Sequence, residues 1–159
     1  MKKFLTFLFF MVLPSLPVIS SNTQHPMCLQ PEDICIVSSL NVPNVELSYE
    51  DLFSIYTLFI RHWDTGAPIR LAMNKKDSIT HKEFVSSILG VTVGRYQRDL
   101  NSKVFDGRVR VEPKEFKSEL ELLEYIAMSD DVIGYVSHDT LDQYQQFAGS
   151  NTLHVIRVF

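Results

Sequence analysis

The 159-residue sequence has few cysteines and lacks the common catalytic motifs. It contains no G-x-S-x-G nucleophile elbow, no H-E-x-x-H zinc helix and no phosphate-binding P-loop. Two cysteines are too few for a structural zinc site, and none of the five histidines pairs with another at metal-ligand spacing. We therefore expect a protein that is not an enzyme and has no catalytic residues, no metal and no cofactor. Internal repeats and low-complexity segments are also absent from the sequence.

The sequence has no excess of positive charge either. It carries 15 Lys and Arg against 19 Asp and Glu, a formal net charge of −4. An acidic chain does not attract nucleic acid or an anionic membrane through its overall electrostatic field. We therefore expect no nucleic-acid partner, and any site for an anion must depend on local groups.

One long apolar run lies at the N-terminus. Two lysines precede a predominantly apolar stretch from Phe4 to Leu13, and small residues follow it. This order is typical of a secretory signal peptide. We expect residues 1–20 to be removed, which leaves residues 21–159 as a single domain in the periplasm or outside the cell. A retained anchor is the alternative, but the run is shorter than the roughly 20 apolar residues of a transmembrane helix.

The two cysteines, Cys28 and Cys35, lie close together in the segment CLQPEDIC. An exported chain meets an oxidising compartment, in which such a pair can form a disulfide. The bond would tie the N-terminal segment of the mature chain to its first strand. Two free, half-buried thiols are the alternative, and we expect the disulfide.

Segments typical of strands and of helices alternate along the rest of the chain. Short apolar runs, most of them rich in β-branched residues, predict strands at Ile34–Val37, Pro68–Met73, Val132–Val136 and Leu153–Val158. Apolar residues at helical spacing predict helices that begin near Ser48, Thr80, Thr92, Ser118 and Asp139. This alternation predicts an α/β domain with a mixed or largely parallel sheet.

Three local features give sharper expectations. Ser48 and Thr80 are each followed three residues later by the acidic residue of a capping box, so each should cap a helix. We expect the first of these helices to run to near Arg61, with Phe59 on its core-facing side. Gly134, inside a predicted strand, indicates close backbone approach or a bend.

The loop before the Thr80 helix is the candidate binding site. Ser78 and Thr80 offer hydroxyl groups, and a helix start offers backbone N–H groups with partial positive charge. Lys75, Lys76 and His81 add positive charge to an otherwise acidic chain. These five residues suit a small oxyanion. The alternative is an ordinary helix cap beside solvated lysines.

The order of these motifs resembles the periplasmic phosphate-binding proteins of ABC transporters. That family typically shows a Leu-Ser helix start, a Trp-Gly turn before a Pro-Ile strand, a Ser-Gly-Thr helix start, a Phe and an Ile-Gly-Tyr strand. The corresponding residues here are Leu47-Ser48, Trp63 with Gly66, Pro68-Ile69, Ser78-Ile79-Thr80, Phe84 and Ile133-Gly134-Tyr135. The resemblance covers roughly Ile34 to Phe159 and implies one lobe of a type II periplasmic-binding-protein fold, with a mixed sheet flanked by helices.

The resemblance also implies a function in transport or sensing. The expected ligand is phosphate or a similar small oxyanion, and the expected protein partner is a membrane transporter or sensor. Two departures favour a different interpretation, a protein-interaction or sensor-accessory module that has lost its ligand. Ile79 replaces the family's glycine, and its β-branched side chain resists unusual backbone angles. The chain also has residues for one lobe only, which would leave a bound phosphate half exposed to water.

Overall fold

The computed structural model describes residues 34–43, 46–107 and 111–159. The predicted signal peptide and Cys28 lie outside these residues, so the cleavage and the Cys28–Cys35 disulfide stay predictions. Cys35 itself is buried in the first strand. None of the described helices is long and apolar enough to cross a membrane.

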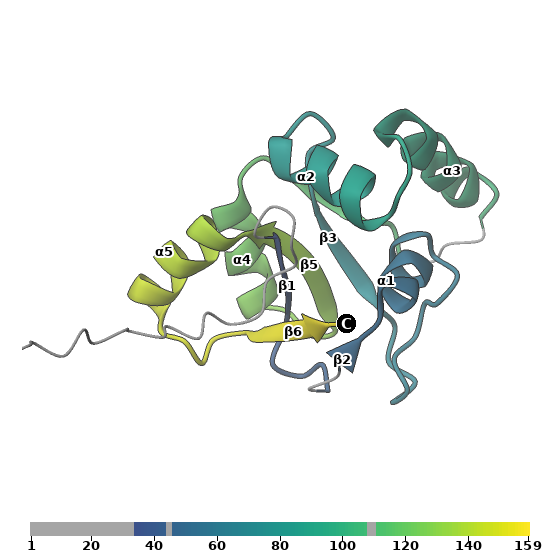
Figure 1. The fold of residues 1–159 in the computed structure, drawn as a ribbon. Coiled ribbons are helices and arrows are strands. Elements are labelled where there is room, and N and C mark those ends of the chain that lie inside the picture. Colours follow the sequence, from purple (N-terminus) through teal and green to yellow (C-terminus); the bar gives the residue numbers. More distant parts are fainter. Residues whose placement is uncertain (1–33, 44–45, 108–110) are drawn as a thin grey trace, which may run out of the picture.

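Six strands form one sheet at the centre of the molecule, in the order β2-β6-β1-β5-β3-β4 (Figure 1). The strands are β1 (Ile34–Ser38), β2 (Glu46–Leu47), β3 (Arg70–Asn74), β4 (Lys114–Phe116), β5 (Val132–Ser137) and β6 (His154–Val158). Strand β1 runs antiparallel to its neighbours β5 and β6, whereas β3 runs parallel to β4 and β5. The predicted α/β fold with a mixed sheet is therefore confirmed.

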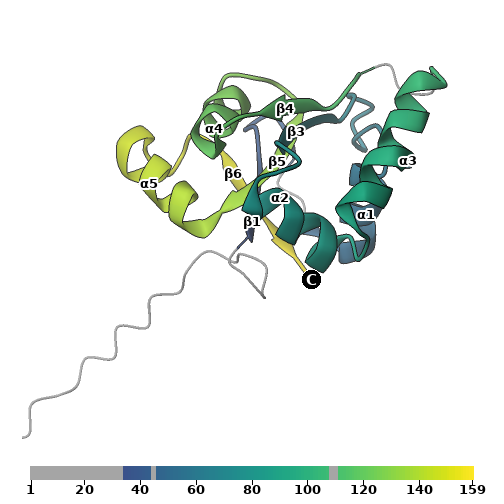
Figure 2. The ribbon, with the colours of Figure 1, turned by 90° about the horizontal axis from the view of Figure 1, so that it is seen from above.

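Helices cover both faces of this sheet (Figures 1 and 2). One face carries α1 (Tyr49–Tyr56), α2 (Ile79–Glu83), the π-helical turn η1 (Phe84–Ile88) and α3 (Val93–Phe105). The other face carries α4 (Glu119–Ala127) and α5 (His138–Ala148). Because helix α2 continues directly into η1, the two form one helical segment along the sheet.

The alternation of side chains along β1 explains why the molecule has two layers of core. Ile34 and Ile36 join the apolar cluster beneath α1, η1 and α3. Cys35 and Val37 point the other way and join the cluster beneath α4 and α5. Successive residues of a strand face opposite sides of a sheet, so a continuous apolar run such as this one predicts a strand covered on both faces.

Helix α1 begins as predicted but ends earlier. The Ser48 hydroxyl accepts a hydrogen bond from the N–H of Asp51 at 3.1 Å, and the Asp51 carboxylate accepts one from the N–H of Ser48 at 2.9 Å. The helix ends at Tyr56, not near Arg61. Leu58 adopts a positive φ of 63°, which no α-helix accommodates. Phe59 is consequently 70 % exposed rather than part of the core.

Gly134 confirms the predicted close approach. A Cβ atom at this position would lie 2.8 Å from Cδ1 of Ile126 on α4 and 3.1 Å from the carbonyl oxygen of Ala72 on β3. The missing side chain therefore lets α4 lie directly on the centre of the sheet. This contact fixes the position of α4, whose first residue, Glu119, belongs to the candidate site described next.

Candidate functional site

Ser78, not Thr80, caps helix α2. The Ser78 hydroxyl accepts a hydrogen bond from the N–H of His81 at 3.1 Å, and the Ser78 backbone is extended, as a capping residue requires. Thr80 lies inside the first turn. The predicted capping box of Thr80 was therefore wrong, because the helix begins one residue after Ser78 and takes the earlier of the two hydroxyl residues as its cap.

The Thr80 hydroxyl instead donates a hydrogen bond to a carboxylate on α4, which covers the other face of the sheet. The acceptor is Oε1 of Glu119, which is far away in the sequence. The second oxygen, Oε2, accepts hydrogen bonds from the backbone N–H of Ser137 at 3.0 Å and from the Ser137 hydroxyl at 2.7 Å. Thr140 Oγ1 lies 2.8 Å from the Ser137 hydroxyl. We call these four residues the Glu119 cluster.

The Glu119 cluster favours a negative charge at its centre. Burial raises the pKa of Glu119, but hydrogen bonds from Thr80 and from the Ser137 side chain and backbone outweigh burial, so the pKa lies below its ordinary value. The side chain is therefore ionised at neutral pH. Ser137 also caps α5 through the N–H of Thr140, at 3.4 Å. The oxyanion held by these neutral hydroxyl and amide donors is thus the carboxylate of Glu119.

His81 lies in the interior, away from solvent. It is 1 % exposed, and its Nδ1 lies 2.6 Å from the Tyr135 hydroxyl. The centroid of its ring lies 6.0 Å from that of Tyr96 and 6.2 Å from that of Tyr135. Its Nε2 has no hydrogen-bond partner among the described residues. Burial lowers the pKa of His81, so the ring is neutral at pH 7. In this position the histidine contributes packing and a hydrogen bond, with no positive charge for an anion.

We expect His81 to make the fold sensitive to mild acid. Its pKa in the folded chain lies below the unfolded value of 6.5, so the contribution of this residue to stability is present above pH 6.5 and is lost as the pH falls below it. The free energy of unfolding, measured in urea, should fall between pH 7.5 and pH 5. His81→Gln should show a smaller fall, whereas exposed His62→Gln should behave as wild type. Equal pH dependence in all three proteins would contradict this expectation.

The five residues predicted to bind an anion therefore lie in different surroundings. Lys75 and Lys76 are exposed on the loop that leads into α2, and Ser78 caps that helix. Thr80 is buried against Glu119, and His81 turns towards the core. The structure brings Thr80 together with a group of donors that the sequence did not reveal, and the binding of an anion by the five residues stays a prediction.

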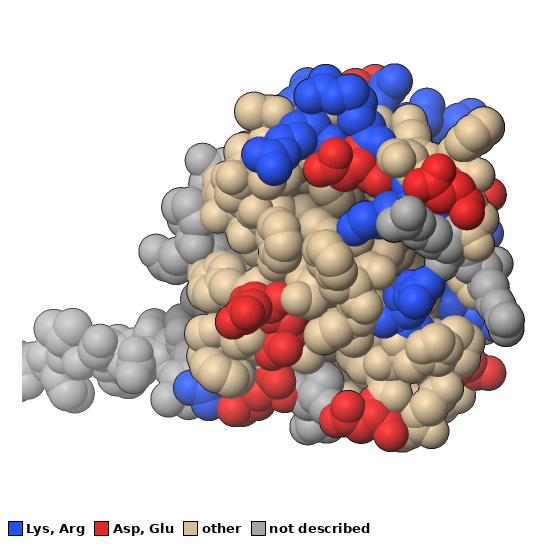
Figure 3. Space-filling model, turned by 90° about the vertical axis from the view of Figure 1, so that its right-hand side faces the viewer, with Lys and Arg blue, Asp and Glu red and all other residues tan. Residues whose placement is uncertain are grey.

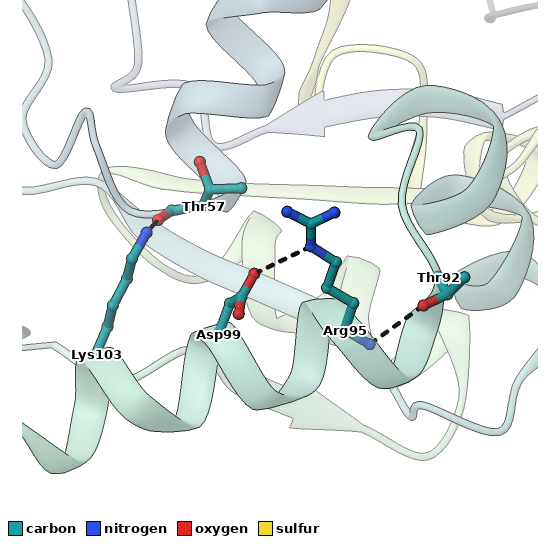
Figure 4. Close-up of polar contacts among 5 residues, drawn as sticks. All are labelled: Thr57, Thr92, Arg95, Asp99 and Lys103. Carbon is teal, nitrogen blue, oxygen red and sulfur yellow. Dashed lines mark hydrogen bonds and ion pairs between the residues drawn. The ribbon is translucent and has the colours of Figure 1, made fainter.

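A groove of about 390 Å³ between α1 and α3 is the second candidate site. Figure 3 shows the face of the molecule that carries α3, where basic and acidic side chains lie around an uncharged surface. In the groove, the Lys103 side chain reaches across from α3 to donate to the carbonyl oxygen of Thr57 (Figure 4). Arg95 Nε lies 3.9 Å from the Asp99 carboxylate. Basic and acidic side chains therefore lie side by side in this groove.

The described residues offer no metal centre, since no three or more His, Cys, Asp or Glu side chains among them lie close enough to share an ion. The residues that sequence reasoning missed are Glu119, Ser137 and Thr140. Each sits at the start of a helix and reads as an ordinary capping or first-turn residue. Their convergence depends on the sheet order, which places the end of β5 beside the end of β3.

Comparisons with known proteins identify the fold. An ABC-type phosphate transport receptor from Vibrio cholerae matches with a TM-score of 0.58 and 16 % identity, over 80 % of this chain and 46 % of that one. PstS from Borrelia burgdorferi matches with a TM-score of 0.59 and 16 % identity, over 80 % of this chain and 47 % of that one. A putative phosphate ABC transporter substrate-binding protein with bound phosphate from Clostridium perfringens matches with a TM-score of 0.57 and 17 % identity. This match covers 80 % of this chain and 45 % of that one.

The chain spans just under half the length of these three structures. No protein-family model and no curated protein matches its sequence. At such low identity the similarity describes the fold, and the fold prediction is confirmed. The chain has a mixed α/β fold similar to part of the type II periplasmic binding proteins.

Proposed function

We propose that this chain is an exported, solute-binding-like protein that recognises phosphate or a similar small oxyanion at the Glu119 cluster and the adjacent loop. One observation supports the proposal most strongly: two hydroxyl groups and a backbone N–H converge on the oxygens of one ionised carboxylate. Donors that satisfy carboxylate oxygens also suit phosphate oxygens, because hydrogen bonds to an ionised acceptor are the strong ones. The donor set is therefore suited to an oxyanion.

The loop beside the cluster would add charge to this donor set. Lys75 and Lys76 are exposed just before Ser78, and both side chains are long enough to turn towards an anion bound near Thr80. An ammonium group attracts an oxyanion as a point charge without a fixed geometry. The predicted set of Ser78, Thr80 and the two lysines thus keeps a role in the proposal, whereas His81 would act by holding α2 in place.

The role would be one in transport or sensing, without catalysis. Two of the similar structures are described as a phosphate transport receptor and a putative phosphate ABC transporter substrate-binding protein, and the similarity covers less than half of each. Because the fold described here matches only part of those structures, we propose that a membrane transporter or sensor contributes to the site. Export after removal of residues 1–20 would bring the chain to such a partner.

Calorimetric titration with phosphate, and with sulfate for comparison, tests the proposal on the chain expressed without residues 1–20. We expect saturable binding that Thr80→Val weakens roughly tenfold or more, because a hydrogen bond to a charged group contributes about 1.5–3 kcal/mol. Thr152→Val is the matched control, since its hydroxyl donates to the Gly149 carbonyl on the exposed surface. Binding that is unchanged in Thr80→Val would contradict the proposed site.

A protein-interaction module without a free ligand is the second candidate. It is favoured by the same carboxylate, because Glu119 already satisfies the donors of Thr80 and Ser137 without any added anion. Phe59, at the edge of the α1–α3 groove, is 70 % exposed, and exposed aromatic surface is typical of contact sites. Absence of heat with either anion, from a protein that unfolds cooperatively, would favour this candidate over the first.

A further inference from the structure

Glu119 reaches the donor cluster from a different part of the fold. It is the first residue of α4, on the opposite face of the sheet from α2. Its carboxylate nevertheless accepts hydrogen bonds from Thr80, 39 positions earlier, and from Ser137, 18 positions later. Both carboxylate oxygens are engaged, so a single side chain joins three helix starts.

We infer that Glu119 is an internal ligand: its carboxylate occupies the donors that we propose bind an oxyanion, and competes with free anions for Thr80 and Ser137. The inference rests on the proposed function and adds the group that regulates access to the same site. Its physical basis is that one hydroxyl proton cannot be donated fully to two acceptors at once. A second anion beside the ionised carboxylate would also meet a like charge in a partly buried position.

Two consequences follow for the strength of binding. Phosphate must displace the carboxylate of Glu119, so the wild-type chain should bind phosphate more weakly than its donor set allows. Removing the carboxylate should leave the Thr80 hydroxyl and the Ser137 backbone N–H without their acceptor, and unpaired donors away from water favour an incoming acceptor. Loss of one acidic residue should therefore increase the affinity for an anion.

A purely structural cross-link between α2, α4 and α5 is the competing explanation. It predicts that loss of Glu119 lowers stability without creating affinity for phosphate. The two explanations agree on stability and differ on binding, so binding must be measured. Glu121→Ala is the matched control, because Glu121 lies in the same first turn of α4 and its backbone N–H donates to Ser118.

The test titrates wild type, Glu119→Ala, Glu119→Gln and Glu121→Ala with inorganic phosphate, by calorimetry and by the phosphate-dependent shift in melting temperature. We expect Glu119→Ala to bind at least tenfold more tightly than wild type, with a larger melting shift, and Glu121→Ala to match wild type. Adding Thr80→Val to Glu119→Ala should remove the gain. If Glu119→Ala does not fold, Glu119→Gln, which keeps the size of the side chain and removes its charge, should still bind more tightly than wild type.

The outcomes separate this inference from the proposed function. Wild-type binding that depends on Thr80 but does not improve in either Glu119 variant would overturn the inference and leave the proposed function standing. No binding by any folded variant would overturn both. Binding by the Glu119 variants alone would support the internal ligand and show that the donors of the wild-type chain are closed to free phosphate, which favours the interaction module as the natural role.

Discussion

Gly134→Val should lower the free energy of unfolding by about 3 kcal/mol, at the upper end of the usual cost of overpacking a core. The added Cβ would lie 2.8 Å from Ile126 Cδ1, 3.0 Å from Leu122 Cδ2 and 3.1 Å from the Ala72 carbonyl oxygen. The two side chains can rotate, but the carbonyl belongs to β3, which pairs with β5. The backbone of α4 or of the sheet must therefore move.

Urea unfolding measures this loss, and Gly94→Ala is the control. Gly94 lies in α3, where an added Cβ would have its nearest neighbour at 3.8 Å, the Arg98 guanidinium. Alanine should stabilise this helix by roughly 0.5–1 kcal/mol. A Gly134→Val protein within about 0.5 kcal/mol of wild type would show that α4 does not press on the sheet as described, and would weaken the placement of Glu119 as well.

Phe84→Ala should lower the free energy of unfolding by about 4 kcal/mol, as expected for a fully buried aromatic residue. Phe84 is 1 % exposed, and its ring stacks on Tyr135 with a centroid distance of 3.9 Å and an interplanar angle of 3°. Its ring also meets Tyr56 edge-on at 4.6 Å. The variant leaves a cavity between η1 and the sheet that these rings cannot close.

The control for this prediction is Phe105→Ala, because Phe105 is 92 % exposed at the end of α3. Its loss should change the free energy of unfolding by less than about 0.5 kcal/mol. Phe84 also anchors the segment that carries Thr80, so Phe84→Ala should weaken phosphate binding together with stability. Equal stability of the two phenylalanine variants would contradict the position of η1 against the sheet.

The sequence predicted the buried strands and most helix starts because their signals are local. The continuous apolar run of β1 identifies a buried strand by itself, and a glycine inside the β5 run indicates a close approach even though the groups that approach lie elsewhere in the sequence. Strand β4 was missed, since it has three residues of which only Phe116 is buried, too few for a periodic pattern. The early end of α1 was missed because leucine rarely adopts a positive φ, so the sequence carries no signal for the conformation of Leu58.

The candidate site was harder to predict than the fold. Thr80 was identified from helix-start chemistry, and its actual partner comes from the far side of the sheet. A side chain at a helix start can cap its own helix or bind elsewhere, and the sequence does not distinguish these roles. Glu119 was not singled out, because an acidic residue in the first turn of a helix is explained by its favourable interaction with the helix dipole. Only the three-dimensional arrangement shows that it fills a cluster of donors.

A crystal structure of Glu119→Ala in arsenate tests the central claim most directly, because arsenic scatters anomalously and replaces phosphate with little change in shape. We predict an anomalous peak within hydrogen-bonding distance of the Thr80 and Ser137 hydroxyl groups, at the place vacated by the carboxylate. An arsenate bound elsewhere, or an empty cluster in crystals grown at a saturating concentration, would contradict the account and leave Glu119 as a structural cross-link.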